Sequence, residues 1–117
     1  TMADNHARGT TMISCKLYVG SPDGGPFTDD MRGRITALVA RTVESFTVQD
    51  ADGYYQGNPV ATLIISVCCD PRRRGDIVKL GEGLAVVSQQ KEVALEIMPT
   101  MEITVAEFFR CRTGSYQ

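Results

Sequence analysis

This chain lacks most of the residues on which common enzyme mechanisms and metal sites depend. It holds a single histidine, His6, which lies in a polar N-terminal stretch. A serine–histidine–aspartate triad, a cysteine–histidine pair and a histidine-based metal site therefore find no support. A dinucleotide-binding glycine fingerprint and a phosphate loop with lysine before serine or threonine are also missing. We therefore expect no metal and no cofactor, and these absences favour a binding protein over an enzyme without excluding catalysis.

Positive charge and long apolar runs are scarce as well. Twelve Lys and Arg residues face 14 Asp and Glu residues, which leaves a net charge of −2. Nucleic acid is not an expected partner, because neutralising phosphates requires clustered basic side chains. No apolar run approaches the roughly 20 residues that cross a bilayer, so we expect no membrane partner and a cytoplasmic location.

The length fits one domain with a core of its own. We expect a disordered tail over residues 1–10 and a single α+β domain over residues 11–117. The four cysteines are expected to be reduced thiols, since no secretion signal precedes them. Cys68 and Cys69 are adjacent in an apolar segment, so their side chains should point to opposite faces of a strand.

The first half of the chain predicts a strand, a helix and a second strand. Residues 13–19 alternate between apolar and polar side chains, as in a half-buried strand. A loop rich in glycine and proline follows, and Thr28 is placed to cap a helix that runs to about Val43. A strand resumes at residues 46–48, and residues 50–53 (DADG) indicate a turn or bulge. After it the strand can continue through Tyr54 and Tyr55 as far as Gly57, Asn58 and Pro59.

The second half repeats the order. Residues 60–69 predict a central strand, and residues 70–75 a loop after which Asp76 caps a helix weakened by Gly81 and Gly83. Residues 93–97 predict the next strand, which Pro99 should end. Beyond it lies a fifth strand or a short helix. The order predicts a ferredoxin-like β-α-β-β-α-β sandwich with a C-terminal extension.

Two groups of residues are candidates for ligand binding. Arg72, Arg73 and Arg74 precede a predicted helix, where phosphate or carboxylate can bind by charge and forked hydrogen bonds. The alternative is an ordinary solvated loop. The second group, Tyr18, Tyr54, Tyr55 and Asp50, is expected near the open side of the sheet, where aromatic residues often line a pocket. The alternative there is packing within the core or along a sheet edge.

Several segments also carry a resemblance to known proteins. Residues 17–20 (LYVG), the glycine-rich loop, residues 46–48 (FTV) with Asp50 and Gly53, and the later strand resemble an uncharacterised family of small bacterial proteins of unknown function. The likeness covers about residues 15–98, with Tyr54 and Tyr55 where that family tends to have tryptophan. More distantly the chain resembles the nitrogen-regulatory PII-like trimers, although their basic effector-binding residues find no counterparts. The resemblance implies a fold and no catalytic residues.

Two functions follow as hypotheses. The first is a small homo-oligomeric binding or regulatory module without enzymatic activity, which takes a small-molecule ligand or a protein partner at the sheet face or between subunits. The second is a cofactor-independent enzyme with a pocket over the open sheet face, where Tyr18, Tyr54 or Asp50 supplies polar groups. The open face should carry a mixture of polar and apolar side chains, which favours association into a dimer or trimer.

Overall fold

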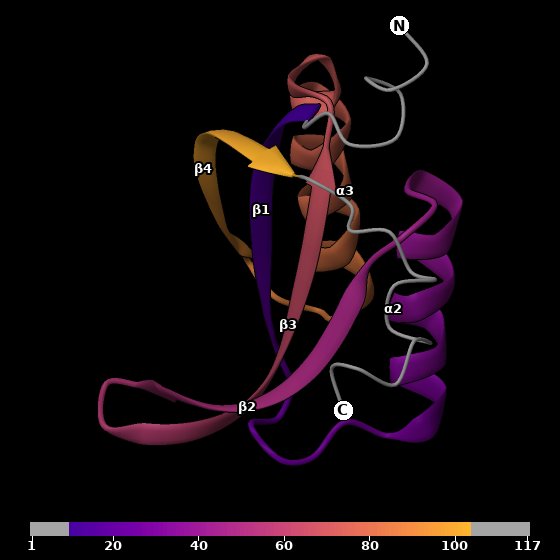
Figure 1. Ribbon diagram of the computed structural model, residues 1–117. Coiled ribbons are helices and arrows are strands. Elements are labelled where there is room, and N and C mark those ends of the chain that lie inside the picture. Colours follow the sequence, from indigo (N-terminus) through magenta and orange to yellow (C-terminus); the bar gives the residue numbers. More distant parts are fainter. Residues whose placement is uncertain (1–9, 104–117) are drawn as a thin grey trace, which may run out of the picture.

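The chain folds into a four-stranded antiparallel sheet with two helices on one face, as Figure 1 shows. The computed structural model describes residues 10–103. The elements are β1 (Thr10–Gly20), α2 (Asp29–Thr42), β2 (Thr47–Tyr55), β3 (Asn58–Cys69), the 3-10 turn η1 (Pro71–Arg73), α3 (Arg74–Val87) and β4 (Ala94–Ile103). The strand order is β2-β3-β1-β4, which confirms the predicted ferredoxin-like α+β sandwich.

The hydrophobic core lies between the sheet and the two helices. On the central strands β1 and β3, alternate side chains such as Leu17 and Ile65 are fully buried against the helices. On the helices, Ile35 and Ile77 complete the same cluster. The alternation read from the sequence therefore assigned the faces of both strands correctly, because a strand places successive side chains on opposite faces.

Helix α2 begins and ends where the sequence predicts. The Thr28 side chain accepts a hydrogen bond from the backbone N–H of Met31 at 3.1 Å, which caps the helix. Asp29 and Asp30 occupy the first turn, where carboxylates interact favourably with the helix dipole. The helix ends at Thr42, because Val43 already has an extended backbone.

The turn predicted at residues 50–53 is wrong. Strand β2 continues through this segment, and Asp50 pairs with Leu63 of β3. The hairpin instead turns at Gln56 and Gly57, whose φ angles are 51° and 82°. Two consecutive residues with positive φ form the tight turn that matches the twist of paired strands. This backbone conformation therefore sets where the hairpin turns.

The start of α3 also differs from the prediction. Asp76 does not cap the helix; it lies in the first turn, after the short η1 segment. Asp70 caps η1 by accepting a hydrogen bond from the N–H of Arg72 at 2.8 Å. Gly81 lies against the buried Leu17, and a side-chain carbon built at Gly81 would be 3.3 Å from Leu17 Cδ2. This glycine therefore lets α3 approach the sheet closely.

Pro99 does not end the last strand, and residues 101–103 belong to β4 rather than to a fifth strand. Met12 of β1 pairs with Met101, whereas Ser14 pairs with Met98, so β4 holds one extra residue at this irregularity. An edge strand with a bulge tolerates proline, because its missing N–H is not needed in the ladder. The rest of the predicted extension, and the predicted tail up to residue 9, lie outside the described residues.

Candidate functional site

A hollow lies where the β2–β3 hairpin meets the loop that leads into α2; we call it the hairpin hollow. Its volume is about 450 Å³. The loop, α2 and both strands of the hairpin contribute to its wall, so it exists only in the folded chain. The lining residues are Pro26, Phe27, Arg32, Asp50, Ala51, Asp52, Ala61 and Thr62.

An ion pair joins two sides of the hairpin hollow. Arg32 of α2 donates two hydrogen bonds to Asp50 of β2, with N–O distances of 2.8 and 3.0 Å. These bonds lower the pKa of the Asp50 carboxyl below its ordinary value. The forked geometry orients both side chains, although the pair is exposed to solvent. A ligand in this hollow would therefore meet one guanidinium and one carboxylate, those of Arg32 and Asp50, whose positions are already set.

Backbone hydrogen bonds hold the loop at the hollow to the hairpin. The N–H of Ser21 donates to the carbonyl of Ala61, and the N–H of Ala61 donates to the carbonyl of Gly24, each at 2.9 Å. The Asp23 carboxylate accepts from the N–H of Gly25 at 2.9 Å. These bonds hold the loop against the hairpin and so fix one wall of the hollow. In the sequence, only the glycine and proline content indicated this loop.

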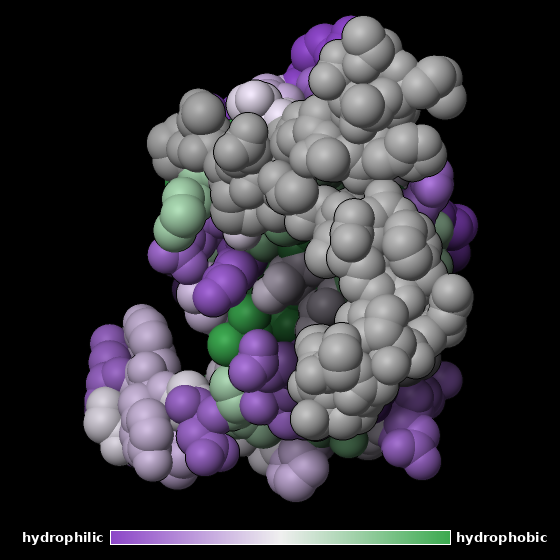
Figure 2. Space-filling model, in the orientation of Figure 1, coloured by the Kyte–Doolittle hydropathy of each residue, from purple (hydrophilic) through white to green (hydrophobic). Residues whose placement is uncertain are grey.

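Tyr18 lies on the open face of the sheet, away from the helices. Its hydroxyl donates a hydrogen bond to Glu96 at 2.8 Å, and this bond raises the pKa of the Tyr18 phenol. Ile64 is its partner on β3 and Ala94 its partner on β4. Figure 2 is viewed from this side, and hydrophobic residues are visible near the middle of the described surface among polar ones.

Asp50 lies on the opposite face of the sheet from Tyr18. Its partner on β3 is Leu63, which is fully buried toward the helices. The two side chains therefore line no common pocket in the described part of the chain. Tyr54 and Tyr55 lie elsewhere again, near the tip of the hairpin, with exposed fractions of 73% and 68%. Figure 1 shows that the hairpin extends beyond the rest of the sheet.

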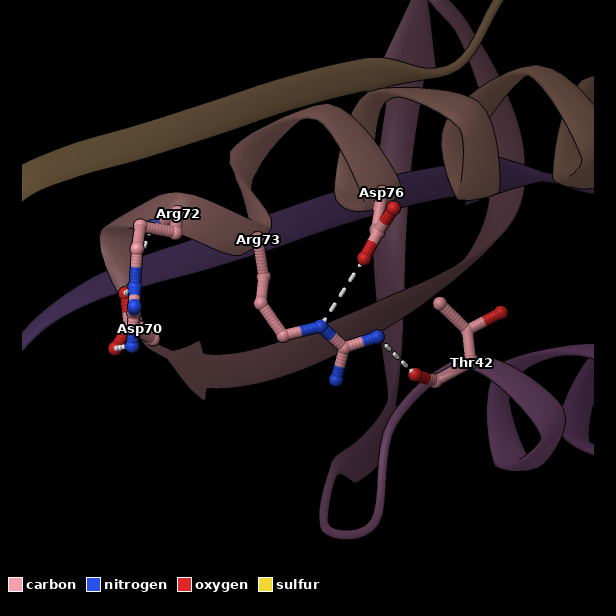
Figure 3. A network of polar contacts seen from close by, with 5 residues as sticks. All are labelled: Thr42, Asp70, Arg72, Arg73 and Asp76. Atoms are coloured by element: carbon pink, nitrogen blue, oxygen red, sulfur yellow. Dashed lines mark hydrogen bonds and ion pairs between the residues drawn. The ribbon is translucent and has the colours of Figure 1, made fainter.

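The three arginines do not converge on one point. Arg72 pairs with Asp70 at 3.0 Å, and this contact lowers the pKa of the Asp70 carboxyl to about 2. Arg73 reaches toward α2, where its guanidinium donates to the backbone carbonyl of Thr42 at 2.6 Å. Arg74 is exposed at the first residue of α3. Figure 3 shows Arg72 and Arg73 directed to separate partners.

Sequence reasoning missed Arg32 as a site residue. No local pattern marks it, because its partner Asp50 is 18 residues away on another element. A charged residue in a helix usually lies on the surface, exposed to solvent. The contact that distinguishes Arg32 arises when α2 packs beside β2.

The cysteines of the described part are all free thiols. Cys15 and Cys69 are buried beneath the helices, whereas Cys68 is exposed on the open face, as the alternation predicts. Burial raises the pKa of the Cys15 thiol to about 11, so it stays protonated at neutral pH. Within residues 10–103, no three or more His, Cys, Asp or Glu side chains gather to hold a metal ion.

Comparison with solved structures places this arrangement among known folds. A DUF3240 family protein from Shewanella baltica OS155 superposes with a TM-score of 0.59 at 10% identity, covering 81% of this chain and 97% of that one. A phage SAM lyase in its apo state gives 0.56 at 19% identity, covering 83% and 92%.

The third structure is CPII, a nitrogen regulatory PII-like protein from Thiomonas intermedia K12, bound to ADP, AMP and bicarbonate. It gives a TM-score of 0.54 at 11% identity, covering 86% of this chain and 98% of that one. The fold is that of the PII-like proteins. This confirms, at the level of the fold, the resemblance read from the sequence. No family model and no curated protein matches the chain. None of the described helices is long and apolar enough to span a membrane.

Proposed function

We propose that this chain is a small binding or regulatory module that associates into a homo-oligomer and takes a small-molecule ligand in the hairpin hollow. The observation that carries the proposal is the hollow itself, in which Arg32 and Asp50 are held in a forked pair beside Phe27. Such a mixture of an aromatic wall and oriented polar groups is typical of ligand sites.

The charge of the lining indicates which ligands to test first. Asp50 and Asp52 face one guanidinium, that of Arg32, so carboxylates exceed cations. The PII-like neighbour was solved with ADP and AMP, and another neighbour is a SAM lyase. ADP carries negative charge and SAM carries a sulfonium cation. We therefore expect SAM to bind in the hairpin hollow more tightly than ADP.

The test is calorimetric titration of the full chain with SAM, its neutral analogue S-adenosylhomocysteine, and ADP. The double variant Arg32→Gln/Asp50→Asn removes the ion pair without leaving a lone charge, and it should weaken binding of whichever ligand occupies the hollow. The matched control is Arg72→Gln/Asp70→Asn, which removes a comparable exposed pair elsewhere. Equal loss in both variants, or no change in either, would contradict the proposed site.

The open sheet face supports the proposal of a homo-oligomer. Met98 is 56% exposed there, and Ile64 and Cys68 share the same face. Apolar groups on such a face are usually covered in soluble proteins, and a second copy of the chain is the occupant we propose.

Light scattering tests the association directly. The variant Ile64→Glu places a charge in the middle of the face and should shift the protein toward the monomer. The control Val86→Glu makes the same change on the outer surface of α3, where Val86 is 78% exposed, and should leave the mass unchanged. A wild-type monomer at tens of micromolar would refute this part of the proposal.

A cofactor-independent enzyme is the second candidate. The observation that favours it is that one protein with this fold is an enzyme, the SAM lyase. On the open face, the Tyr18 hydroxyl and Glu96 form a polar pair that a substrate can approach. Incubation with SAM, followed by chromatography of the remaining SAM, tests this candidate. Consumption that Tyr18→Phe abolishes would favour the enzyme over the binding module.

A further inference from the structure

A second hollow lies between the end of α2 and the start of α3, on the helical side of the molecule; we call it the helix hollow. Its volume is about 380 Å³. Three basic side chains line it, those of Arg41, Arg73 and Lys79, together with the single carboxylate of Asp76. It shares no lining residue with the hairpin hollow.

Arg73 lines the helix hollow and is held in place by two hydrogen bonds. Its guanidinium donates to the carbonyl of Thr42 at 2.6 Å and to the Asp76 carboxylate at 3.1 Å, as Figure 3 shows. A guanidinium has further N–H groups beyond these two bonds, and they are available to a ligand. Because its position is fixed by both helices, Arg73 loses little conformational entropy when a ligand binds.

The contact with Thr42 has an electrostatic effect as well. The carbonyl of Thr42 belongs to the last turn of α2, where the helix dipole is negative. Arg73 satisfies this carbonyl and offsets the negative end that faces the hollow.

Arg41 and Lys79 flank this fixed guanidinium from the two helices. Both side chains are exposed, and neither takes part in the ion pairs formed within residues 10–103. Three cations against one carboxylate leave an excess of two positive charges around the hollow, although the whole chain carries a net charge of −2. The lining of the helix hollow is therefore positive in a chain that is negative as a whole.

We propose that the helix hollow binds the phosphate group of a small molecule. A phosphate dianion presents tetrahedral oxygens in several directions and carries more charge than a carboxylate, which suits a hollow lined by three cations from separate elements. Leu38 and Leu80 complete the lining and offer apolar surface to the organic part of a phosphate ester. The site differs from the three consecutive arginines that the sequence indicated, because only Arg73 of that group takes part.

Calorimetric titration of the full chain with inorganic phosphate tests the proposal, at an ionic strength held constant with sodium chloride. We expect saturable binding with a dissociation constant in the millimolar range. The double variant Arg41→Gln/Lys79→Gln should weaken binding at least tenfold, since the loss of even one charge-assisted hydrogen bond is worth about that factor. Its melting temperature should stay close to that of the wild type, because both residues are exposed.

The control Arg34→Gln/Lys91→Gln removes two exposed positive charges elsewhere and should leave phosphate affinity unchanged. Arg32→Gln/Asp50→Asn should also leave it unchanged, which separates this site from the hairpin hollow. Phenyl phosphate that binds more tightly than inorganic phosphate identifies a phosphate ester as the ligand, and equal affinities identify free phosphate. An equal loss in the Arg34/Lys91 control, or no saturable binding by the wild type, overturns the proposal.

Discussion

Two glycine-to-alanine substitutions, one in each helix, test how closely α3 packs against the sheet. Gly33 lies on the exposed side of α2, and a side-chain carbon built there has no atom within 4 Å. Alanine favours the helix over glycine by about 0.8–1.0 kcal/mol. We therefore expect Gly33→Ala to raise the free energy of unfolding by that amount and the melting temperature by roughly 3–6 °C.

Gly81→Ala brings the same intrinsic preference to α3 but a different environment. The new methyl group would lie 3.3 Å from Leu17 Cδ2, and Leu17 is fully buried in the central strand β1. Excess volume in a packed core typically costs 1–3 kcal/mol, which offsets or exceeds the gain in helix preference. We expect no net stabilisation, and a loss of up to about 2 kcal/mol.

Urea unfolding followed by circular dichroism measures both changes, at one protein concentration so that association does not alter the comparison. A third variant, Gly81→Ala/Leu17→Val, relieves the contact by removing a methyl group. It should show a favourable coupling energy in a double-mutant cycle. If Gly81→Ala stabilises the protein as much as Gly33→Ala does, the close approach of α3 to β1 is wrong.

Three further predictions concern ionisable side chains. Brief treatment with iodoacetamide should label Cys68 and spare Cys15 and Cys69, as peptide mapping would show, because Cys68 alone is exposed among the three cysteines of the described residues. Equal labelling of Cys15 would contradict its burial. Reducing agent should leave the melting temperature unchanged, since the described cysteines are thiols. Hydrogen bonds from arginine lower the pKa values of Asp50 and Asp70 in the folded protein, that of Asp70 to about 2. Their stabilising contribution is therefore present above the ordinary value of 3.8 and is lost as pH falls through the lowered values. In the variant Asp50→Asn/Asp70→Asn, the free energy of unfolding should therefore fall less steeply as the pH is lowered into the acid range. An unchanged pH dependence would show that the two ion pairs do not contribute to stability.

The sequence alone determined the order of the elements and the faces of the strands. Alternation in β1 and β3 assigned the buried side correctly, and Thr28 marked the start of α2. These features are local. Successive side chains of a strand point to opposite faces, and a capping side chain bonds to an amide only three residues away. A local pattern predicts the structure correctly when tertiary packing favours the same conformation.

The tertiary structure decided the remaining features. Residues 50–53 have turn composition, yet pairing with β3 and the contact from Arg32 keep Asp50 in a strand. Pro99 continues β4 because the strand lies at an edge and holds a bulge. Both outcomes depend on partners distant in the sequence, which a local pattern does not contain.

Both hollows also depend on contacts that only the tertiary structure creates. Arg32 meets Asp50 only when α2 packs beside β2, and Arg73 meets the end of α2 only when the start of α3 lies next to it. In the sequence, Arg41 and Lys79 are ordinary surface residues of two separate helices. They line one hollow because packing brings the end of α2 next to the start of α3. The charge that lines each hollow therefore depends on the fold.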